Sequence, residues 1–272
     1  MNKTVFIDFD GTLADRGLIP APHLEAVHAA RAAGHRIFLC TGRPKVMVPP
    51  RVREGLFDGL VCAAGGYVEI DGEVLRDVRF PAELARRTAA VLVRDRASFL
   101  LEAPDAVYSS VASARRVQAL FTSPSWPADD IDGVDDLLAA LRPTDDLGGQ
   151  SFSKVSVFDS PVPVTAMAEE IGAEVGALPN SVTGLSGHAG ELYRLGVDKS
   201  TGIAAVEAHL GLRRDDIIAI GDGHNDLEML AYAGVGVAVE EAPPEVREVA
   251  QLIIPGPAAA GLVPGFAELG LV

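Results

Sequence analysis

The feature that most constrains this chain is a pair of alternate acidic residues directly behind a short apolar run. Val5-Phe6-Ile7 is followed by Asp8-Phe9-Asp10-Gly11-Thr12-Leu13, which predicts a buried strand that ends in a turn. In parallel α/β sheets, ligands bind at the carboxyl ends of the strands. Two carboxylates this close repel each other unless a cation neutralises them. The motif therefore predicts a metal site, with a plain Asp-Gly turn as the alternative.

Size and charge narrow the classes of function. The chain has 272 residues, of which 48% are hydrophobic, enough for one large domain or two modest ones with a real core. Its formal net charge is -15, which repels phosphate backbones, and the sequence contains no basic run. We therefore expect no nucleic-acid partner.

The cysteines and the start of the chain bear on the compartment. Cys40 and Cys62 each end an apolar strand-like run, which favours buried thiols in a reducing environment over a disulfide framework. The first residues lack the pattern of a signal peptide, and no apolar stretch reaches about 18 residues. We expect a cytoplasmic protein that makes no membrane contact.

The order of the predicted elements indicates a parallel sheet. Residues 20–33 predict a helix and residues 36–40 a second buried strand, which completes a β-α-β unit. Thr41-Gly42-Arg43 follow that strand and so bring a hydroxyl and backbone amides beside the first acids. Further strands are expected at 59–62 and, as a hairpin around Asp71-Gly72, at 67–70 and 73–75.

A second domain interrupts this pattern. From about residue 81 the predicted strands no longer end in acids, and residues 123–149 form a loose acidic stretch that holds Trp126. The doubly wound pattern is expected to resume with a strand at 191–194, a helix at 199–210 and a buried strand at 217–220. We therefore predict an α/β core of residues 1–80 and 186–272, and an inserted α/β domain of residues 81–185.

Four ordered motifs of this chain resemble those of the haloacid dehalogenase superfamily. The family's D-x-D-G-T-L matches Asp8–Leu13, its T-G-R matches Thr41–Arg43, its lysine matches Lys199, and its G-D-x-x-N-D matches Gly221–Asp226. The insertion resembles the cap of the Cof-like subfamily. The resemblance implies a Rossmann-like parallel sheet with an inserted α/β cap. One stretch departs from the subfamily, which usually has Asn-Gly-Ala where this chain has Ala63-Ala64-Gly65-Gly66.

The resemblance also implies roles for the acids. Asp8 is the expected nucleophile, which forms an aspartyl phosphate. Asp10 is expected to protonate the leaving oxygen and then to activate water. Asp8, Asp222 and the backbone carbonyl of Asp10 are expected to hold Mg²⁺, with Asp226 as a further ligand or directly beside the ligands.

The remaining motif residues are expected to bind phosphate, and each has a plainer alternative. Thr41 and Lys199 would bind the phosphoryl oxygens together with the amides of Gly11 and Gly42. Thr41 could instead only close a turn, and Lys199 alone would be read as a surface lysine. Asn225 is expected either to bind phosphate or to cap a helix, and the two can be one role.

Some residues outside the motifs are also candidates. His224 is a possible substrate contact. In the inserted domain, substrate contact competes with surface or core placement for four residues, namely Trp126, Arg115, Arg116 and Lys154.

The combined features predict a Mg²⁺-dependent phosphatase that acts on a small phosphorylated metabolite. A phosphate monoester is dianionic near neutral pH, so an attacking carboxylate needs a cation and positive groups around the phosphoryl oxygens. Sugar phosphates are the leading substrate class. The alternatives are a phosphatase for nucleotide, flavin or pyridoxal phosphates, a phosphosugar mutase, and a non-catalytic binding protein. The last is disfavoured because Asp8 and Asp10 are both present.

Overall fold

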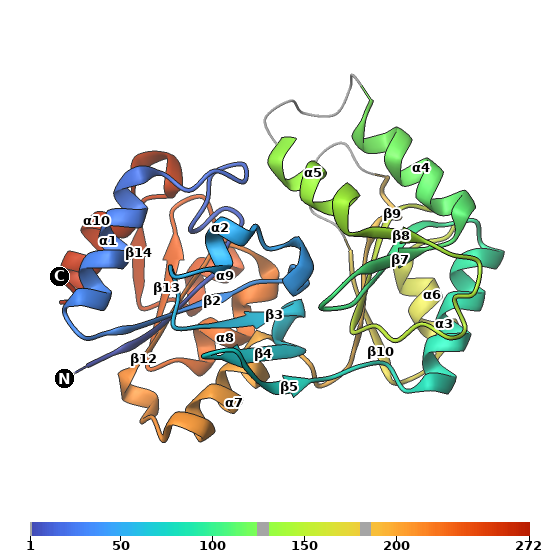
Figure 1. Ribbon diagram of the computed structural model, residues 1–272. Coiled ribbons are helices and arrows are strands. Elements are labelled where there is room, and N and C mark those ends of the chain that lie inside the picture. The colour runs from blue at the N-terminus through green and yellow to red at the C-terminus, as the bar shows by residue number, and fades with distance from the viewer. Residues whose placement is uncertain (1, 124–130, 180–185) are drawn as a thin grey trace. The chain divides into compact units, whose positions relative to one another are not determined.

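The computed structural model describes residues 2–123, 131–179 and 186–272, which form two compact units (Figure 1). The first unit comprises Met1–Arg43, Val48–Asp77 and Asp198–Val272. The second comprises Pro44–Met47 and Val78–Val197. Each unit has its own sheet and its own apolar core.

The first unit is built on an eight-stranded sheet in the order β14-β13-β12-β1-β2-β3-β4-β5. The strands from β14 to β3 run parallel, and β4 and β5 extend the sheet antiparallel. The strands are β1 (Thr4–Ile7), β2 (Arg36–Cys40), β3 (Gly59–Cys62), β4 (Tyr67–Ile70), β5 (Glu73–Asp77), β12 (Ile217–Gly221), β13 (Val235–Val239) and β14 (Leu252–Ile254).

The order in which successive strands join the sheet reverses between β1 and β12. After β1 the chain adds β2 and β3 on one side, and after β12 it adds β13 and β14 on the other. Helix α1 (Ala21–Ala32) joins β1 to β2, whereas α8 (Leu227–Tyr232) joins β12 to β13 on the other side of the sheet's centre. Because such crossovers are right-handed, the two helices cover opposite faces. The carboxyl ends of β1 and β12 thus form the switch point at which doubly wound sheets bind ligands.

Helices bury both faces of this sheet. Helix α1 packs beside α10 (Leu262–Glu268), and α7 (Lys199–Leu210) packs beside α8 (Figure 1). The short helices α2 (Pro50–Arg53) and α9 (Pro244–Val249) complete the layers. The strands β1 and β12 are buried along their whole length, as expected of parallel strands that are covered on both faces.

The second unit is built on a six-stranded sheet in the order β10-β11-β9-β6-β7-β8. Its elements are β6 (Ser98–Glu102), β7 (Val107–Ser109), β8 (Leu141–Pro143), β9 (Lys154–Asp159), β10 (Val175–Pro179), β11 (Gly190–Arg194), α3 (Ala82–Arg94), α4 (Val111–Phe121), α5 (Ile131–Ala140) and α6 (Val164–Ile171). Phe99 packs with the apolar side of α3 and α6, and its neighbour Leu100 packs with α4 and α5. Helices therefore contact both faces of this sheet.

Two expectations for this region were wrong. The strand expected at 191–194 exists as β11, but it pairs with β9 and β10 of the second sheet instead of resuming the first. Its Leu192 is buried in the core of the second unit. Unlike β1 and β12, β11 is followed by no acid but by Leu195 and Gly196.

The stretch expected to be loose, residues 123–149, contains α5 and β8. Val134 and Leu137 bury one side of α5 against α4. Their spacing of three residues is the helical signal, and the surrounding acids obscured it. Trp126 lies outside the described residues.

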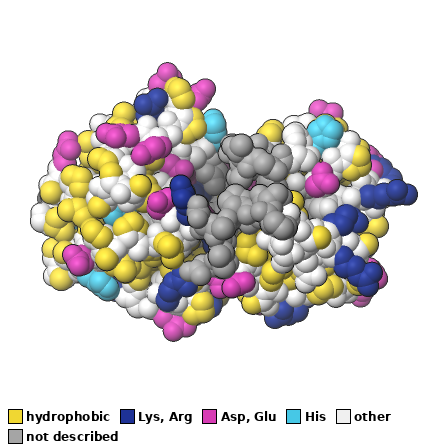
Figure 2. Space-filling model, turned by 90° about the horizontal axis from the view of Figure 1, so that it is seen from above, with side chains coloured by type: hydrophobic (Ala, Val, Ile, Leu, Met, Phe, Trp, Pro, Cys, Tyr) yellow, Lys and Arg dark blue, Asp and Glu magenta, His cyan; other side chains and the backbone are white. Residues whose placement is uncertain are grey.

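Figure 2 shows one face of the molecule, which carries charges of both signs. On the face shown in Figure 2, acidic and basic side chains are scattered among apolar ones. Over the described ranges, no helix is both long and apolar enough to cross a membrane.

A tight contact positions the start of α7 and can be tested. Gly65 follows β3 with φ +91°, and a Cβ built on it would lie 1.9 Å from the carbonyl oxygen of Asp198. Gly72 has a similar φ of +80°, with nothing within 4 Å of such a Cβ. We expect Gly72→Ala to cost about 1–2 kcal/mol from the left-handed backbone alone. Gly65→Ala should cost roughly 3 kcal/mol or more, because overpacking adds to that strain.

Urea unfolding of both variants measures this difference. Equal losses of unfolding free energy would show that the approach of Gly65 to Asp198 does not constrain the fold.

Candidate active site

The predicted motif residues converge at the carboxyl ends of the central strands. Asp8 directly follows β1, and its amide donates to the carbonyl of Ile220 in β12 at 2.9 Å. Asp222 directly follows β12, and Thr41 directly follows β2. The sheet register therefore brings together groups that lie more than 200 residues apart in the sequence.

The loop that carries the first two acids is fixed by its own backbone. The amide of Leu13 donates to the carbonyl of Asp8 at 3.1 Å, and the amide of Gly11 donates to the carbonyl of Ala14 at 3.0 Å. Gly11 has φ +84°, and a Cβ there would lie 2.4 Å from Asp222 Oδ2. Only glycine fits this position.

Lys199 is the central cation of the site. It is the first residue of α7, which Asp198 caps by accepting from the amide of Thr201 at 3.0 Å. Its side chain is fully buried, and Nζ lies 2.5 Å from both Asp8 Oδ1 and Asp226 Oδ1. The alternative of a surface lysine is therefore wrong.

Charge interactions keep this lysine protonated. Burial works to lower the pKa of Lys199, but the carboxylates of Asp226 and Asp8 outweigh it and raise the pKa above its ordinary value. A buried ammonium is stable only when it is paired in this way.

Asp226 organises the fourth motif as well as pairing with Lys199. Its Oδ2 accepts from the amides of Asp222 and Gly223 at 3.0 and 2.9 Å. Asp222 in turn accepts from Thr12 Oγ1 at 2.8 Å. The first and fourth motifs are thus joined directly by side chains.

Three carboxylates form a candidate metal centre. Asp8, Asp222 and Asp226 each offer an oxygen within 4.8 Å of the others. Burial raises the pKa of Asp8 well above its ordinary value against the opposing charge of Lys199, and the neighbouring acids raise it further. Burial and the charge of Asp226 raise the pKa of Asp222 to about 6. A triad of oxygen donors that is costly to ionise fits a hard divalent cation.

Asp10 lies apart from this triad, with half of its side chain exposed. Arg43 binds its carboxylate with two bonds, Nε to Oδ2 at 2.8 Å and Nη2 to Oδ1 at 2.6 Å. The guanidinium carbon of Arg43 also lies 4.9 Å from the centre of the Phe9 ring. Arg43 was expected only as the last residue of the second motif, with no role of its own. Its position directly after Thr41-Gly42, close to the strand ends, was the available signal for this contact.

The expected phosphate-binding residues differ in their contacts. Thr41 is buried, and its Oγ1 accepts from the amide of Arg43 at 3.1 Å, so it does close the turn. Helix α8 starts behind Asp226 without a side-chain cap bond, so Asn225 is not its cap. Gly42 lies between the two residues that this bond joins. Phosphate binding by these residues stays a prediction, as does the substrate contact of His224, whose Nε2 lies 3.9 Å from Glu245 Oε2.

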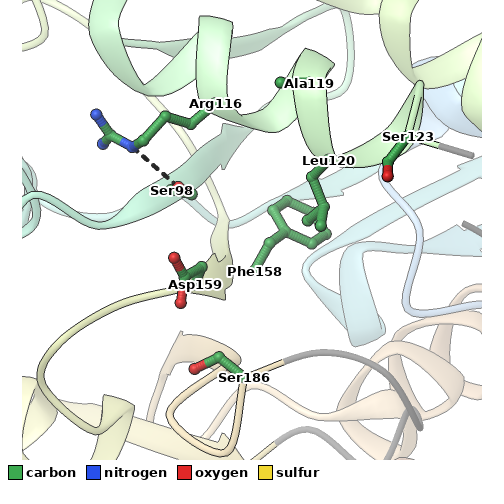
Figure 3. Close-up of a pocket in the computed structure, with 8 residues that line it drawn as sticks. All are labelled: Ser98, Arg116, Ala119, Leu120, Ser123, Phe158, Asp159 and Ser186. Carbon is green, nitrogen blue, oxygen red and sulfur yellow. Dashed lines mark hydrogen bonds between the residues drawn. The ribbon is translucent and has the colours of Figure 1, made fainter. Parts of the chain in front are cut away.

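The candidates in the second unit have structural contacts. Lys154 is buried, with Nζ 2.5 Å from Glu191 Oε1 and 3.5 Å from Glu102 Oε2. Arg116 donates to Ser98 Oγ at 3.0 Å beside a hollow of about 510 Å³ (Figure 3). The residues that line the hollow are Ser98, Arg116, Ala119, Leu120, Ser123, Phe158, Asp159 and Ser186. Arg115 is exposed on α4.

Comparison with known proteins assigns the chain to a family. Residues 5–264 match the profile of the family described as haloacid dehalogenase-like hydrolase. The chain belongs to this family and is a hydrolase of that superfamily, as the four motifs predicted.

Individual relatives agree over nearly the whole chain. The protein YkrA of Bacillus subtilis (strain 168), whose phosphatase name is provisional, is 26% identical over 274 residues, which cover 100% of this chain and 99% of YkrA. The phosphoglycolate phosphatase of Archaeoglobus fulgidus is 27% identical, in an alignment that covers 99% of this chain and 98% of that protein. A solved sugar phosphatase of HAD subclass IIB shares the fold, with a TM-score of 0.78, 21% identity and full coverage of both chains.

The raised pKa of Asp222 leads to a test of the acidic triad. Because this pKa is about 6 in the folded protein against an ordinary 3.8, the folded state binds more protons than the unfolded chain between these values. Without a divalent cation, this carboxyl therefore destabilises the fold increasingly as pH rises through that window. We expect Asp222→Asn in EDTA to gain unfolding free energy relative to wild type between about pH 4 and about pH 7.

Mg²⁺ should reverse the order near pH 7 by stabilising the wild type and not the variant. Urea unfolding with and without MgCl₂ measures both effects, with the exposed Asp105→Asn as the control. A variant that follows the wild type at every pH and Mg²⁺ concentration would contradict this description of the triad.

Proposed function

We propose that the chain is a Mg²⁺-dependent phosphatase that hydrolyses small phosphate monoesters through an aspartyl phosphate. The observation that carries the proposal is Lys199, held 2.5 Å from both Asp8 and Asp226 at the end of a parallel sheet. A carboxylate aligned by a buried cation beside further oxygen donors suits attack on a dianionic phosphoryl group. Membership of the hydrolase family supports the same reading.

Asp8, Asp222 and Asp226 would hold the Mg²⁺ ion, together with the backbone carbonyl of Asp10. Their oxygens are the donor type that Mg²⁺ prefers. When bound, the ion supplies charge neutralisation for the acids and for the phosphoryl oxygens. Lys199, Thr41 and Asn225 would bind those oxygens with the amide of Gly42. The amide of Gly11 would join them only after it leaves the carbonyl of Ala14, to which it donates.

The protein's own acids would carry the two steps. In the first, a carboxylate oxygen of Asp8 forms a bond to phosphorus while the ester oxygen leaves with a proton from Asp10. In the second, Asp10 removes a proton from water, the water oxygen bonds to phosphorus, and the bond to Asp8 breaks. The products are the alcohol and inorganic phosphate. Arg43 must release at least one oxygen of Asp10 for this cycle, since both are engaged by its guanidinium.

Sugar phosphates are the proposed substrate class. The solved subclass IIB sugar phosphatase supports this proposal through the fold that it shares with the chain. A second candidate is a small phosphorylated acid, because the Archaeoglobus fulgidus relative is a phosphoglycolate phosphatase that aligns along its full length. Phosphate release across a panel of sugar phosphates and phosphoglycolate decides between the two.

We also propose that the second unit is the cap that selects the substrate. Its expected extent of residues 81–185 lengthens to Val78–Val197, because β11 pairs within the second sheet. The motif residues serve only the phosphoryl group, which all such substrates share, so discrimination must come from elsewhere. Replacing Val78–Val197 by a short Gly/Ser linker should keep slow hydrolysis of acetyl phosphate and remove the ranking of metabolites. An unchanged ranking would place specificity in the first unit.

The thiols support a cytoplasmic location. Cys40 and Cys62 are both buried, and buried thiols suit a reducing compartment. Cell fractionation tests this location, and recovery of the protein outside the cytoplasm would overturn it.

The nucleophile has a direct test. Asp8→Asn keeps the shape of the side chain but cannot attack phosphorus, so we expect phosphate release to fall by at least about 1,000-fold. EDTA should stop the wild type and added Mg²⁺ should restore it. Asp15→Asn, a change of the same kind outside the motifs, serves as the control. Substantial turnover by Asp8→Asn would exclude Asp8 as the nucleophile.

The acid has a test that depends on the leaving group. Only a poor leaving oxygen needs a proton early, so Asp10→Asn should slow sugar phosphates by about 100-fold or more and aryl phosphates much less. Steady-state kinetics on a series of esters with leaving groups of graded pKa measures this contrast. Equal losses along the series would remove Asp10 from the role of acid.

A further inference from the structure

His23 is a fully buried histidine with hydrogen bonds at both ring nitrogens. It lies in the first turn of α1, where Nδ1 is 2.8 Å from the carbonyl oxygen of Leu13. Its Nε2 is 3.2 Å from the backbone nitrogen of Leu262, the first residue of α10. One side chain therefore joins α1, α10 and the loop that carries the catalytic acids.

The partners determine the protonation state of the ring. A backbone amide can only donate, so Nε2 of His23 must accept from Leu262. The proton then lies on Nδ1, which donates to Leu13. Burial also lowers the pKa of His23, in agreement with a neutral ring. The amide of Leu262 is a first-turn donor that has no partner within its own helix, and His23 supplies one.

The bond from His23 adds a contact from outside the loop to those that the loop makes itself. The amide of Leu13 is already bonded to the carbonyl of Asp8, and the neighbouring Thr12 holds Asp222. The carbonyl of Leu13 accepts a hydrogen bond from the imidazole. His23 thus fixes the peptide that follows Leu13. Two hydrogen bonds in series, from His23 to Leu13 and from Leu13 to Asp8, link the imidazole to the backbone of the nucleophile.

We infer that His23 is a positioning residue, which holds the loop of Asp8 and Asp10 in its reactive arrangement by tying Leu13 to α1 and to the start of α10. The effect on turnover rests on the proposed phosphatase function, whereas the effect on the loop does not. A displacement of about 1 Å in a reacting group can cost about 100-fold in rate. Leu13 is the neighbour of Thr12, which bonds Asp222. Loss of the bond from His23 to Leu13 can therefore displace the reacting groups by a distance of this order.

Three substitutions separate the two bonds of the ring. His23→Asn keeps a donor near the position of Nδ1, His23→Gln keeps an acceptor near the position of Nε2, and His23→Leu keeps neither. His35→Leu is the control, because His35 also bonds a backbone amide, that of Lys3, but at the other end of β1. The substrate is 4-nitrophenyl phosphate with Mg²⁺.

We expect His23→Leu and His23→Gln to lower kcat by up to about 100-fold with little change in KM, because Lys199 and Thr41 lie outside the loosened loop. Amide hydrogen exchange of residues 8–14 should accelerate in the same two variants. His23→Asn should keep both properties near those of the wild type. Nitrogen NMR of the wild type should show a neutral ring protonated at Nδ1.

Each other outcome is decisive. Unchanged exchange and kcat in His23→Gln, or no rescue by His23→Asn, would leave His23 a packing residue and overturn the inference. A ring protonated at Nε2 would do the same. Should His23→Leu fail to fold, the Asn and Gln pair still decides. If the wild type releases no phosphate from any ester, the proposed function fails, while exchange and NMR still test the role of His23.

Discussion

The buried ion pairs of Lys199 are the interaction on which the site depends. A fully buried ammonium is tolerated only because Asp8 and Asp226 each place an oxygen 2.5 Å from it, and removal of a partner from such a pair costs about 3–5 kcal/mol. Asp222 adds a third carboxylate to the same cluster. Burial, and then the excess negative charge left by one cation for three acids, raises the pKa values of Asp8 and Asp222. The same excess charge makes the cluster suitable for a divalent ion.

The surrounding backbone is arranged so that this lysine can reach the strand ends. Helix α7 must start close to β3, and it does so because two glycines meet there. A Cβ on Gly202 would lie 2.8 Å from Cα of Gly65. Gly65 in turn lies against Asp198, the residue that caps α7. Gly11 allows the same closeness between the first and fourth motifs. These glycines therefore support the site through contact distance as well as through backbone conformation.

The sequence predicted those parts of the fold that local patterns encode. Apolar runs ending in acids located β1 and β12, and parallel crossovers then required Asp8 and Asp222 to meet. The strand at 191–194 was assigned to the wrong sheet because strand pairing is a long-range choice that five residues do not specify. The bond between Arg43 and Asp10 and the two bonds of His23 were not predicted for the same reason, since each joins segments whose proximity only the tertiary structure sets.

In the proposed mechanism, the carboxylate held by Lys199 attacks phosphorus before water does. Each in-line displacement inverts the configuration at phosphorus, so two successive displacements restore it. The most direct measurement is the stereochemical course of hydrolysis of a phosphorothioate monoester whose two non-bridging oxygens are different isotopes, carried out in water of the third oxygen isotope. We predict that inorganic thiophosphate is released with net retention. Net inversion would mean that water attacks directly, and would contradict the aspartyl phosphate.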